Sequence, residues 1–458
     1  MLATYLRGLL LLSLLLTPAA WPAPTVAEVD CSTHPLQEAI DAAHPGSVIR
    51  LTGWCEGHFT VDKDLTILGA PAVLSGIGDG TVLTLTNGTT PPLIYLKDLE
   101  IRNGGLGPTD LTAPMAAGGL LLLNSASEPL IAQLENVTIA DNTLPGNDGD
   151  AFGACGVGTS GPVKLTLRNS AIINNGISNI SLDGHVIGGL HLGLQGYLQL
   201  YNTELSGNFN LTDGGSSGGL ECYGHCIMQG GHISNNETGS DSGSSGAGFT
   251  VWRDGFLLME GVRVQDNRSS WDTSVAGGGV ILGHAVLKHT QIRNNQLLGT
   301  GDTDGSGGLL VQGGVLEMMD SAIRGNLAPG VYHRGAAGLT VRGNARASLL
   351  RTTIRDNLAS LSPTGANAGA LLVSNDSQFY GNEVIIRNNE GQTGSVHIGE
   401  QARVILTGSR VQGNLGLITG GIWLDDTASP PGEVLLFNTS LINNTPDNCS
   451  GFTDPACL

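Results

Sequence analysis

The chain has 458 residues, of which 69 are glycine, 4% are aromatic and 13% are charged. Its formal net charge of −19 disfavours sequence-independent binding to nucleic acid or to an anionic membrane. Abundant glycine and scarce aromatic residues are typical of many tight bends around a narrow interior filled by aliphatic side chains. The length alone would suggest two or three domains, but an internal repeat indicates one elongated domain.

Residues 1–27 are typical of a secretory signal peptide: Arg7 precedes an apolar run, Leu9–Leu16, which small residues follow. The run is too short for a membrane span, and no later stretch reaches its length. We expect an exported protein, secreted or at the cell surface, that is monomeric and has no transmembrane segment after cleavage. The sequence does not separate three cleavage positions, after Ala20, Ala23 or Ala27.

The seven cysteines of an exported chain indicate disulfide bonds. We expect Cys155 to be left over as a buried thiol. A metal site at Cys222, His225 and Cys226 is the alternative to a bond across that turn, but it lacks a fourth ligand and the usual spacing. The expected pairs are Cys31–Cys55, Cys222–Cys226 and Cys449–Cys457.

An amphipathic helix is expected between Pro35 and Ala43, with Leu36, Ile40 and Ala43 on one side. Short strands follow it to about residue 110. A helix in front of a repeat array covers the open apolar end. We therefore assign residues 28–110 to an N-terminal cap and the first irregular coils.

From residue 111 to 445 the chain repeats a unit of about 30 residues, and residues 307–326, GGLLVQGGVLEMMDSAIRGN, are a clear copy. Two alternating apolar runs are separated by glycines, and one more aliphatic residue leads into a polar turn that ends in Asn. An aliphatic residue stands three positions before this Asn, and Leu or Met stands eight positions before it except at Gly381. The repeat asparagines are Asn142, Asn175, Asn208, Asn236, Asn267, Asn295, Asn326, Asn357, Asn389, Asn414 and Asn444.

Units with three short strands cannot bury their apolar faces alone, and stacking them makes a continuous core. Strands that return one coil later pair in parallel, so the sequence predicts an all-β fold, a single-stranded parallel β-helix. The Asn then has a structural explanation: Asx residues tolerate left-handed backbone conformations, and stacked amides can bond to one another in a ladder. Residues 446–458 are expected to form a tail closed by a disulfide bond.

The helix, the PG that follows it, the G-x-F-x-V motif and LTILGA together resemble the beginning of pectin-lyase-like right-handed parallel β-helix proteins. The GG doublets before an aliphatic residue are similar to the repeats of polymorphic outer membrane proteins and related adhesins, although Ile, Val or Leu replaces the aromatic residue of their F-x-x-N motif. The resemblance implies a right-handed helix and a passenger domain without a membrane barrel. The doublets begin at Gly118, Gly188, Gly218, Gly278, Gly307 and Gly420.

The motifs of pectin-lyase-like enzymes are not found. Residues 57–61 lack the acidic residue of a pectinesterase-like member, and no polygalacturonase-like motif or Asp–Lys or Asp–Arg cluster is present. The eleven histidines are scattered, mostly at outward positions. We expect no catalytic residue and an adhesion or glycan-binding module. A diverged polysaccharide lyase or hydrolase is the alternative.

Acidic residues recur in the loops after the repeat Asn. Asp is favoured in solubilising turns, and the alternative is a loose Ca²⁺ site on Asp272, Asp302 and Asp304. The offset from the Asn varies from five to nine residues, which weakens the case for a built site. The loop carboxylates are Asp148, Asp150, Asp183, Asp213, Asp241, Asp272, Asp302 and Asp304.

Two residues before the repeat Asn, the side chain should point away from the core. Like charges on neighbouring strands are unfavourable, so a row of arginines there needs a partner. Either Asp320, Asp356 and Glu383 interleave as surface ion pairs, or the row binds a repeating anion such as a uronate-containing glycan, because guanidinium groups bind carboxylates with two hydrogen bonds. The row is Arg293, Arg324, Arg355 and Arg387, flanked by Gln265 and Gln412.

Overall fold

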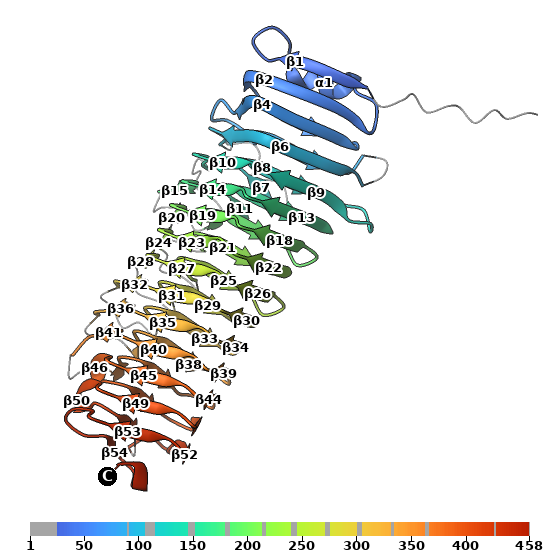
Figure 1. Cartoon of the computed structure of the whole chain (residues 1–458). Coiled ribbons are helices and arrows are strands. Elements are labelled where there is room, and N and C mark those ends of the chain that lie inside the picture. The colour runs from blue at the N-terminus through green and yellow to red at the C-terminus, as the bar shows by residue number, and fades with distance from the viewer. Residues whose placement is uncertain are drawn as a thin grey trace, which may run out of the picture.

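In the computed structural model the chain is a parallel β-solenoid of about 11 turns. It has almost no helix, and the coils stack in sequence order into a rod (Figure 1). The predicted all-β class and parallel pairing are confirmed. The structure describes residues 25–88, 91–105, 115–144, 152–178, 184–212, 217–239, 245–270, 275–299, 305–330, 334–361, 366–425 and 427–457.

One coil shows how the repeat unit forms strands. It consists of β29 (Gly279–Ile281), β30 (His284–Lys288), β31 (Gln291–Arg293) and β32 (Gln296–Leu297). β29 belongs to a 14-stranded sheet, β30 and β31 to a 26-stranded sheet, and β32 to an 11-stranded sheet. Each strand pairs in parallel with its counterpart one coil later, as β30 does with β34 (Val315–Met319). The sheets therefore run along the rod.

The bend before the repeat Asn requires a left-handed backbone. Asn294 has φ 53° and Gly325 has φ 64°. The same position has a positive φ in each of the other regular coils. Among non-glycine residues this conformation is easiest for Asn and Asp, which explains why the residue before the repeat Asn is always Asp, Asn or Gly.

The repeat asparagines are buried and bond from coil to coil. The Nδ2 amide of Asn326 donates to Oδ1 of Asn357 at 2.9 Å and to the carbonyl oxygen of Ile292 at 3.1 Å. Its backbone N–H donates to the same Oδ1 at 3.0 Å. Amide-to-amide bonds continue from Asn142 to Asn444 and on to Asn448. Stacking thus supplies the partners that buried amides need.

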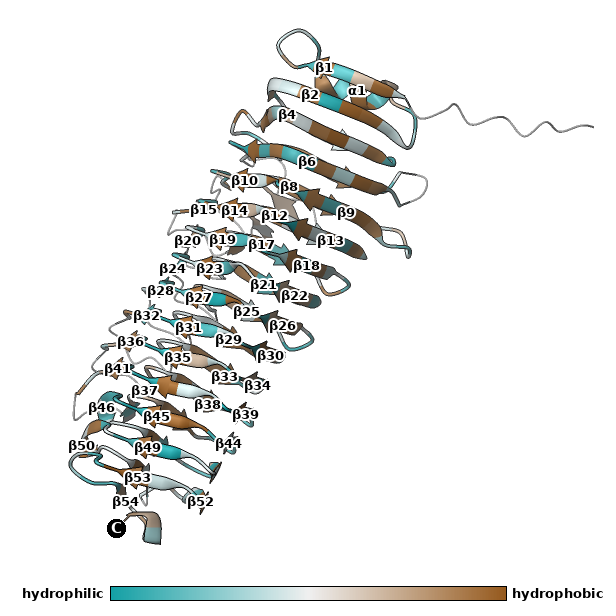
Figure 2. Ribbon diagram, in the orientation of Figure 1, coloured by the Kyte–Doolittle hydropathy of each residue, from teal (hydrophilic) through white to brown (hydrophobic). Residues whose placement is uncertain are grey.

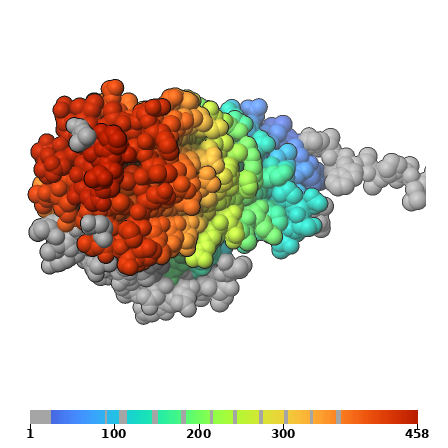
Figure 3. All heavy atoms as spheres, turned by 90° about the horizontal axis from the view of Figure 1, so that it is seen from below, coloured from blue at the N-terminus to red at the C-terminus, as the bar shows by residue number. Residues whose placement is uncertain are grey.

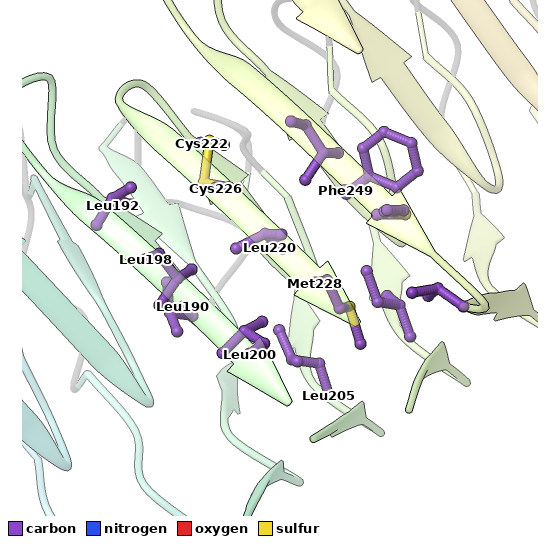
Figure 4. Packing of buried hydrophobic residues seen from close by; sticks show 14 of the residues in the cluster. Leu190, Leu192, Leu198, Leu200, Leu205, Leu220, Cys222, Cys226, Met228 and Phe249 are labelled. Atoms are coloured by element: carbon purple, nitrogen blue, oxygen red, sulfur yellow. A yellow bond between two sulfur atoms is a disulfide. The ribbon is translucent and has the colours of Figure 1, made fainter. Parts of the chain in front are cut away.

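Aliphatic side chains fill the interior of every coil. Figure 4 shows this packing around Leu190, Leu205 and Met228. Figure 2 shows apolar and polar residues alternating along the strands, as expected when every second side chain of a strand points into the core. Gly381 interrupts the Leu and Met column because neighbouring core side chains fill that space: a Cβ on Gly381 would lie 2.7 Å from Leu406 Cδ2 and 3.1 Å from Phe379 Cε1.

The N-terminal end is covered by α1 (Leu36–Ala42), whose Leu36 and Ile40 are buried in the main core. α1 contacts β1 (Val26–Asp30), β2 (Ser47–Glu56) and β3 (Phe59–Val61). Because β1 begins at Val26, cleavage after Ala27 would remove its first two residues. In the space-filling view of Figure 3 the colours run in order from the C-terminal coils to the N-terminal ones.

The last coil consists of β52 (Glu433–Phe437), β53 (Ser440–Ile442) and β54 (Cys449–Ser450), and the 3₁₀ turn η1 (Pro455–Cys457) follows. The structure contains the three expected disulfide bonds, Cys31–Cys55, Cys222–Cys226 and Cys449–Cys457. The bond across residues 222–226 excludes the alternative metal site there. Cys155 is a free, buried thiol, and burial raises its pKa to about 12. None of the described helices is long and apolar enough to cross a membrane.

Candidate acid–base site

The outer face of the 14-stranded sheet carries polar side chains that are nevertheless buried. In β17 (Leu190–Leu192), β21 (Leu220–Cys222) and β25 (Phe249–Val251), the first and third residues point into the core and the middle residue points outward. The middle residues, His191, Glu221 and Thr250, are in register across three coils. Their exposed fractions are only 3%, 0% and 1%.

A small second layer lies beside this face. β11 (Phe152–Ala154) and β16 (His185–Ile187) pair in parallel in a three-stranded sheet, which places Phe152 next to His185. β11 contacts β17. This layer brings His185 to a residue that lies 36 positions later in the chain, Glu221.

Both oxygens of the Glu221 carboxylate accept hydrogen bonds. His185 Nε2 lies 2.9 Å from Oε1 and 3.0 Å from Oε2. His191 Nδ1 lies 2.8 Å from Oε2. The indole Nε1–H of Trp252 donates to Oε1 at 2.7 Å. A single buried carboxylate therefore orients two imidazoles and one indole.

The interactions in the site shift three pKa values. Burial alone would raise the pKa of Glu221, but the charge and hydrogen bond of His185 and the hydrogen bond of His191 outweigh burial and hold that pKa well below its ordinary range. Burial alone would lower the pKa of His185, yet the charge and hydrogen bond of Glu221 raise it. Burial and the charge of Glu221 both raise the pKa of Tyr223. At neutral pH the site holds an ionised Glu221 and a protonated phenol, and the carboxylate favours the cationic form of His185.

Aromatic rings surround the two imidazoles. Phe152 stacks on His185 with ring centroids 5.2 Å apart, and Tyr223 stacks on Trp252 at 5.1 Å. The Tyr223 hydroxyl lies 3.5 Å from His185 Nε2. Phe152 is 38% exposed and the His185 side chain 23% exposed. The site therefore has a buried polar floor and partly open aromatic walls.

The hydrogen bonds assign the ring nitrogens of His191. The ionised Glu221 can only accept, so His191 Nδ1 carries a hydrogen and Nε2 is an acceptor when the ring is neutral. A carboxylate that holds imidazole in this tautomer is the arrangement found in hydrolytic triads. His185 donates through Nε2, and its cationic form has a second N–H at Nδ1. The pair can therefore accept one proton and donate another.

The four arginines predicted to form a row lie side by side in the structure. Arg293 pairs with Arg324, Arg324 with Arg355, and Arg355 with Arg387 on successive strands of the 26-stranded sheet. Interleaving carboxylates occur only in part: Asp356 pairs with Arg355, but Asp320 bonds to Arg351, at 2.7 and 2.9 Å. No described ion pair joins Glu383 to the row.

The calcium hypothesis concerns residues outside the described part of the chain. This holds for Asp272, Asp302 and Asp304 and for the remaining loop carboxylates, Asp148, Asp150, Asp183, Asp213 and Asp241. Among the residues that the structure does describe, no three His, Cys, Asp or Glu side chains form a group suited to a metal ion.

Sequence reasoning missed His185, His191, Glu221, Tyr223 and Trp252. One signal was available. In several coils the outward residue at the corresponding position of the 14-stranded sheet is Leu, Val or Thr, as at Leu121, Val280, Leu310 and Thr340. His191 and Glu221 break this pattern in two adjacent coils. The sequence contains no comparable signal for His185 and Trp252, because these residues come to the site from other coils.

No protein-family model matches the chain, and neither does any curated protein. Among solved structures, the chain is similar to the A-module of the mannuronan C-5 epimerase AlgE4 of Azotobacter vinelandii, with 13% identity over 91% of this chain and 94% of that one and a TM-score of 0.32. A mannuronic acid-specific polysaccharide family 6 lyase from human gut microbiota has 13% identity over 90% and 87%, with a TM-score of 0.35. An alginate lyase from Paenibacillus sp. has 13% identity over 91% and 99%, with a TM-score of 0.23. Likenesses of this strength carry no argument about activity.

Proposed function

We propose that the protein is a polysaccharide-cleaving enzyme that works by proton transfer, with His185, His191 and Glu221 at its centre. The observation that carries this proposal is that one fully buried carboxylate orients two imidazoles. Burying a charge costs several kcal/mol unless it is paired. Titratable groups perturbed in this way concentrate at functional sites.

Elimination fits these groups better than hydrolysis. Glycoside hydrolases generally use two carboxyl groups, one of which must be protonated to act as the acid. In the described part of this site Glu221 is the one carboxylate, and its lowered pKa keeps it ionised. Two imidazoles held by one carboxylate suit a base and an acid, because imidazole both accepts and donates a proton.

In the proposed reaction the substrate is a uronate-containing chain. His191 Nε2 takes the proton from the ring carbon that bears the carboxylate. The electron pair of that C–H bond forms a carbon–carbon double bond, and the bond from the neighbouring carbon to the glycosidic oxygen breaks. His185 gives its Nδ1 proton to the departing oxygen, and both imidazoles exchange protons with water afterwards. The Tyr223 phenol, which stays protonated, donates a hydrogen bond to the sugar.

The test uses the full chain and a panel of polyuronates, followed by ultraviolet absorbance of unsaturated products and by reducing ends. Glu221→Gln and His191→Gln should each lower the rate roughly a hundredfold or more. His58→Asn is the matched control, because His58 also pairs with a carboxylate, Asp79, at 2.8 Å, far from the site. A wild-type protein that releases no products, or variants that retain its rate, would contradict the proposal.

Glycan binding without turnover is the second candidate, because the arginine row and the open face beside it form a long surface. Adhesion at a cell surface and export remain predictions of the sequence. The same assay separates the two candidates: a wild-type chain that binds polyuronate and leaves it intact is a binding protein.

A further inference from the structure

The outer face of the 26-stranded sheet carries a column of rings that is separate from the acid–base site. Tyr197, His225, Phe256 and His284 begin β18 (Tyr197–Tyr201), β22 (His225–Gln229), β26 (Phe256–Glu260) and β30. They are in register on successive coils. Neighbouring ring centroids are 6.3, 5.0 and 5.3 Å apart. The column therefore runs along the rod, across the strands.

The column leads into a groove of about 540 Å³ on the next coils. Val315, which pairs with His284, lines this groove. Its polar lining includes Lys288 and Arg346, and the Arg346 guanidinium lies 4.9 Å from the ring centroid of Tyr380. Met319, 37% exposed, adds an apolar wall. Glu317 also lines the groove, and its Oε1 lies 3.2 Å from Nε2 of His284, so the groove combines two cationic groups, one paired carboxylate and apolar surface.

The arginine row lies on the next strand along each of these coils, as Arg293 does on β31, which follows β30. Successive arginines are one strand spacing apart, about 4.8 Å. Arg293 bonds to the side chain of Gln265 and Arg324 to that of Gln291, both neutral partners. Among the described contacts only Arg355 makes an ion pair. The other three guanidinium groups of the row make no ion pair within the described part of the chain.

The charge of the whole chain is distributed unevenly along the rod. Residues 284–412 contain 11 of the 21 lysines and arginines but only 9 of the 40 aspartates and glutamates, a net charge of +2 in a chain of −19. These residues form the coils that carry the groove and the arginine row. Most of the ring column and the acid–base site lie in the acidic remainder, so charge favours the groove and the arginine row as the part of the rod that an anionic chain contacts first.

We propose that the ring column, the groove and the arginine row form a docking track for an acidic polysaccharide that lies along the rod. The rings lie against one another from coil to coil and form a continuous apolar strip on which sugar rings can pack, and the guanidinium groups bind carboxylates with two parallel hydrogen bonds. The inference deepens the proposed function, because it names the surface that holds the uronate chain while the acid–base site acts. Tyr223 of the acid–base site and His225 of the column lie in the same tight turn, which the Cys222–Cys226 bond closes. The site and the column therefore adjoin at this turn.

The test measures binding of the full chain to alginate and polygalacturonate at low salt, where charge contacts are strongest. Arg324→Gln with Arg355→Gln should raise the Kd about tenfold or more and reduce its salt dependence. Arg50→Gln with Arg268→Gln is the control: it removes the same charge from ion pairs with Glu28 and Glu237, outside the track. Equal weakening in both double variants, or no binding by the wild type, would overturn the track.

Two further measurements identify the kind of polymer that binds to the track. Phe256→Ala with Tyr380→Ala should weaken binding of polyuronate and leave binding of inorganic polyphosphate unchanged, because only sugar rings pack on the apolar surface of these side chains. Single-stranded DNA that binds as tightly as polyuronate would overturn the choice of a glycan. Glu221→Gln should bind polyuronate like the wild type, so loss of turnover with intact binding separates a failure of the enzyme proposal from a failure of the track.

Discussion

The two outward faces of the solenoid are built alike and used differently. On both sheets, alternate residues point into the aliphatic interior and the others point out. On the 14-stranded sheet the outward residues His191 and Glu221 are almost completely buried, whereas on the 26-stranded sheet Tyr197 and Arg324 stay partly exposed. Covering a face changes the chemistry of its residues, because burial strengthens electrostatic interactions and makes every charge require a partner.

Two contrasting histidines lie at the covered face, His185 in the second layer and His397 on the 14-stranded sheet itself. His185 faces the carboxylate of Glu221, which raises its pKa. His397 is the middle residue of β47 (Val396–Ile398), and its ring stacks on Trp423 at 4.2 Å. Neither of its nitrogens has a hydrogen-bond partner in the described chain, and burial lowers its pKa to about 4. Burial alone thus gives a neutral imidazole, and burial beside a carboxylate favours a cationic one.

The largest effect is expected from removing the buried carboxylate. Glu221→Ala leaves the two imidazoles and the Trp252 indole without their acceptor. Breaking a buried pair by removing one partner costs about 3–5 kcal/mol. Denaturant unfolding of the variant measures this cost. A loss of unfolding free energy as small as that caused by His58→Asn would show that burial does not strengthen the interactions of Glu221.

The unpartnered histidine should make the protein acid-sensitive. The folded pKa of His397 is about 4, below the ordinary value of about 6.5. The unfolded chain therefore binds the proton first, and stability is lost as pH falls from about 6.5 towards 4, by up to an amount on the order of 3 kcal/mol. His397→Phe should remove this dependence. Parallel stability curves for variant and wild type between these pH values would contradict the prediction.

The paired histidine should behave in the opposite way. Because the folded pKa of His185 is raised, its pairing with Glu221 stabilises the fold fully below the unfolded value of about 6.5 and progressively less as pH rises through the folded value. His185→Gln should therefore destabilise the protein more at mildly acidic pH than at alkaline pH. Melting temperatures of the variant and the wild type across this pH range provide the test. A difference between them that widens with rising pH would contradict the raised pKa of His185.

The smallest effect on stability is expected on the open face. Arg324→Gln with Arg355→Gln removes two like charges from adjacent strands and one exposed ion pair, so the free energy of unfolding should change by no more than about 0.5 kcal/mol. Thermal unfolding provides the measurement. A large loss would show that the row stabilises the rod, and its role in binding would then need a different explanation.

Much of the fold could be predicted because each strand pairs with the equivalent strand of the next repeat. The repeat period therefore gives the long-range pairing as well as the local structure. The repeat predicts a left-handed bend, although at the Asn and not at the residue before it, where the structure has it. The Asn also predicts a partner one coil later. The site could not be predicted to the same depth. His191 and Glu221 occupy equivalent positions of adjacent coils, but His185 comes from the second layer and Trp252 from the coil after Glu221, and the loops that connect coils follow no repeat.

By itself, the sequence determined the period, the inward residues, the Asn column and the arginine row, because each depends on alternation along a strand and on stacking of equivalent positions. The tertiary structure decided which outward residues are covered. A period of two distinguishes inside from outside but contains no information on what packs against the outside. That packing buries Glu221 between two imidazoles and leaves the ring column and the arginines accessible, and so it separates the proposed reacting site from the proposed docking track.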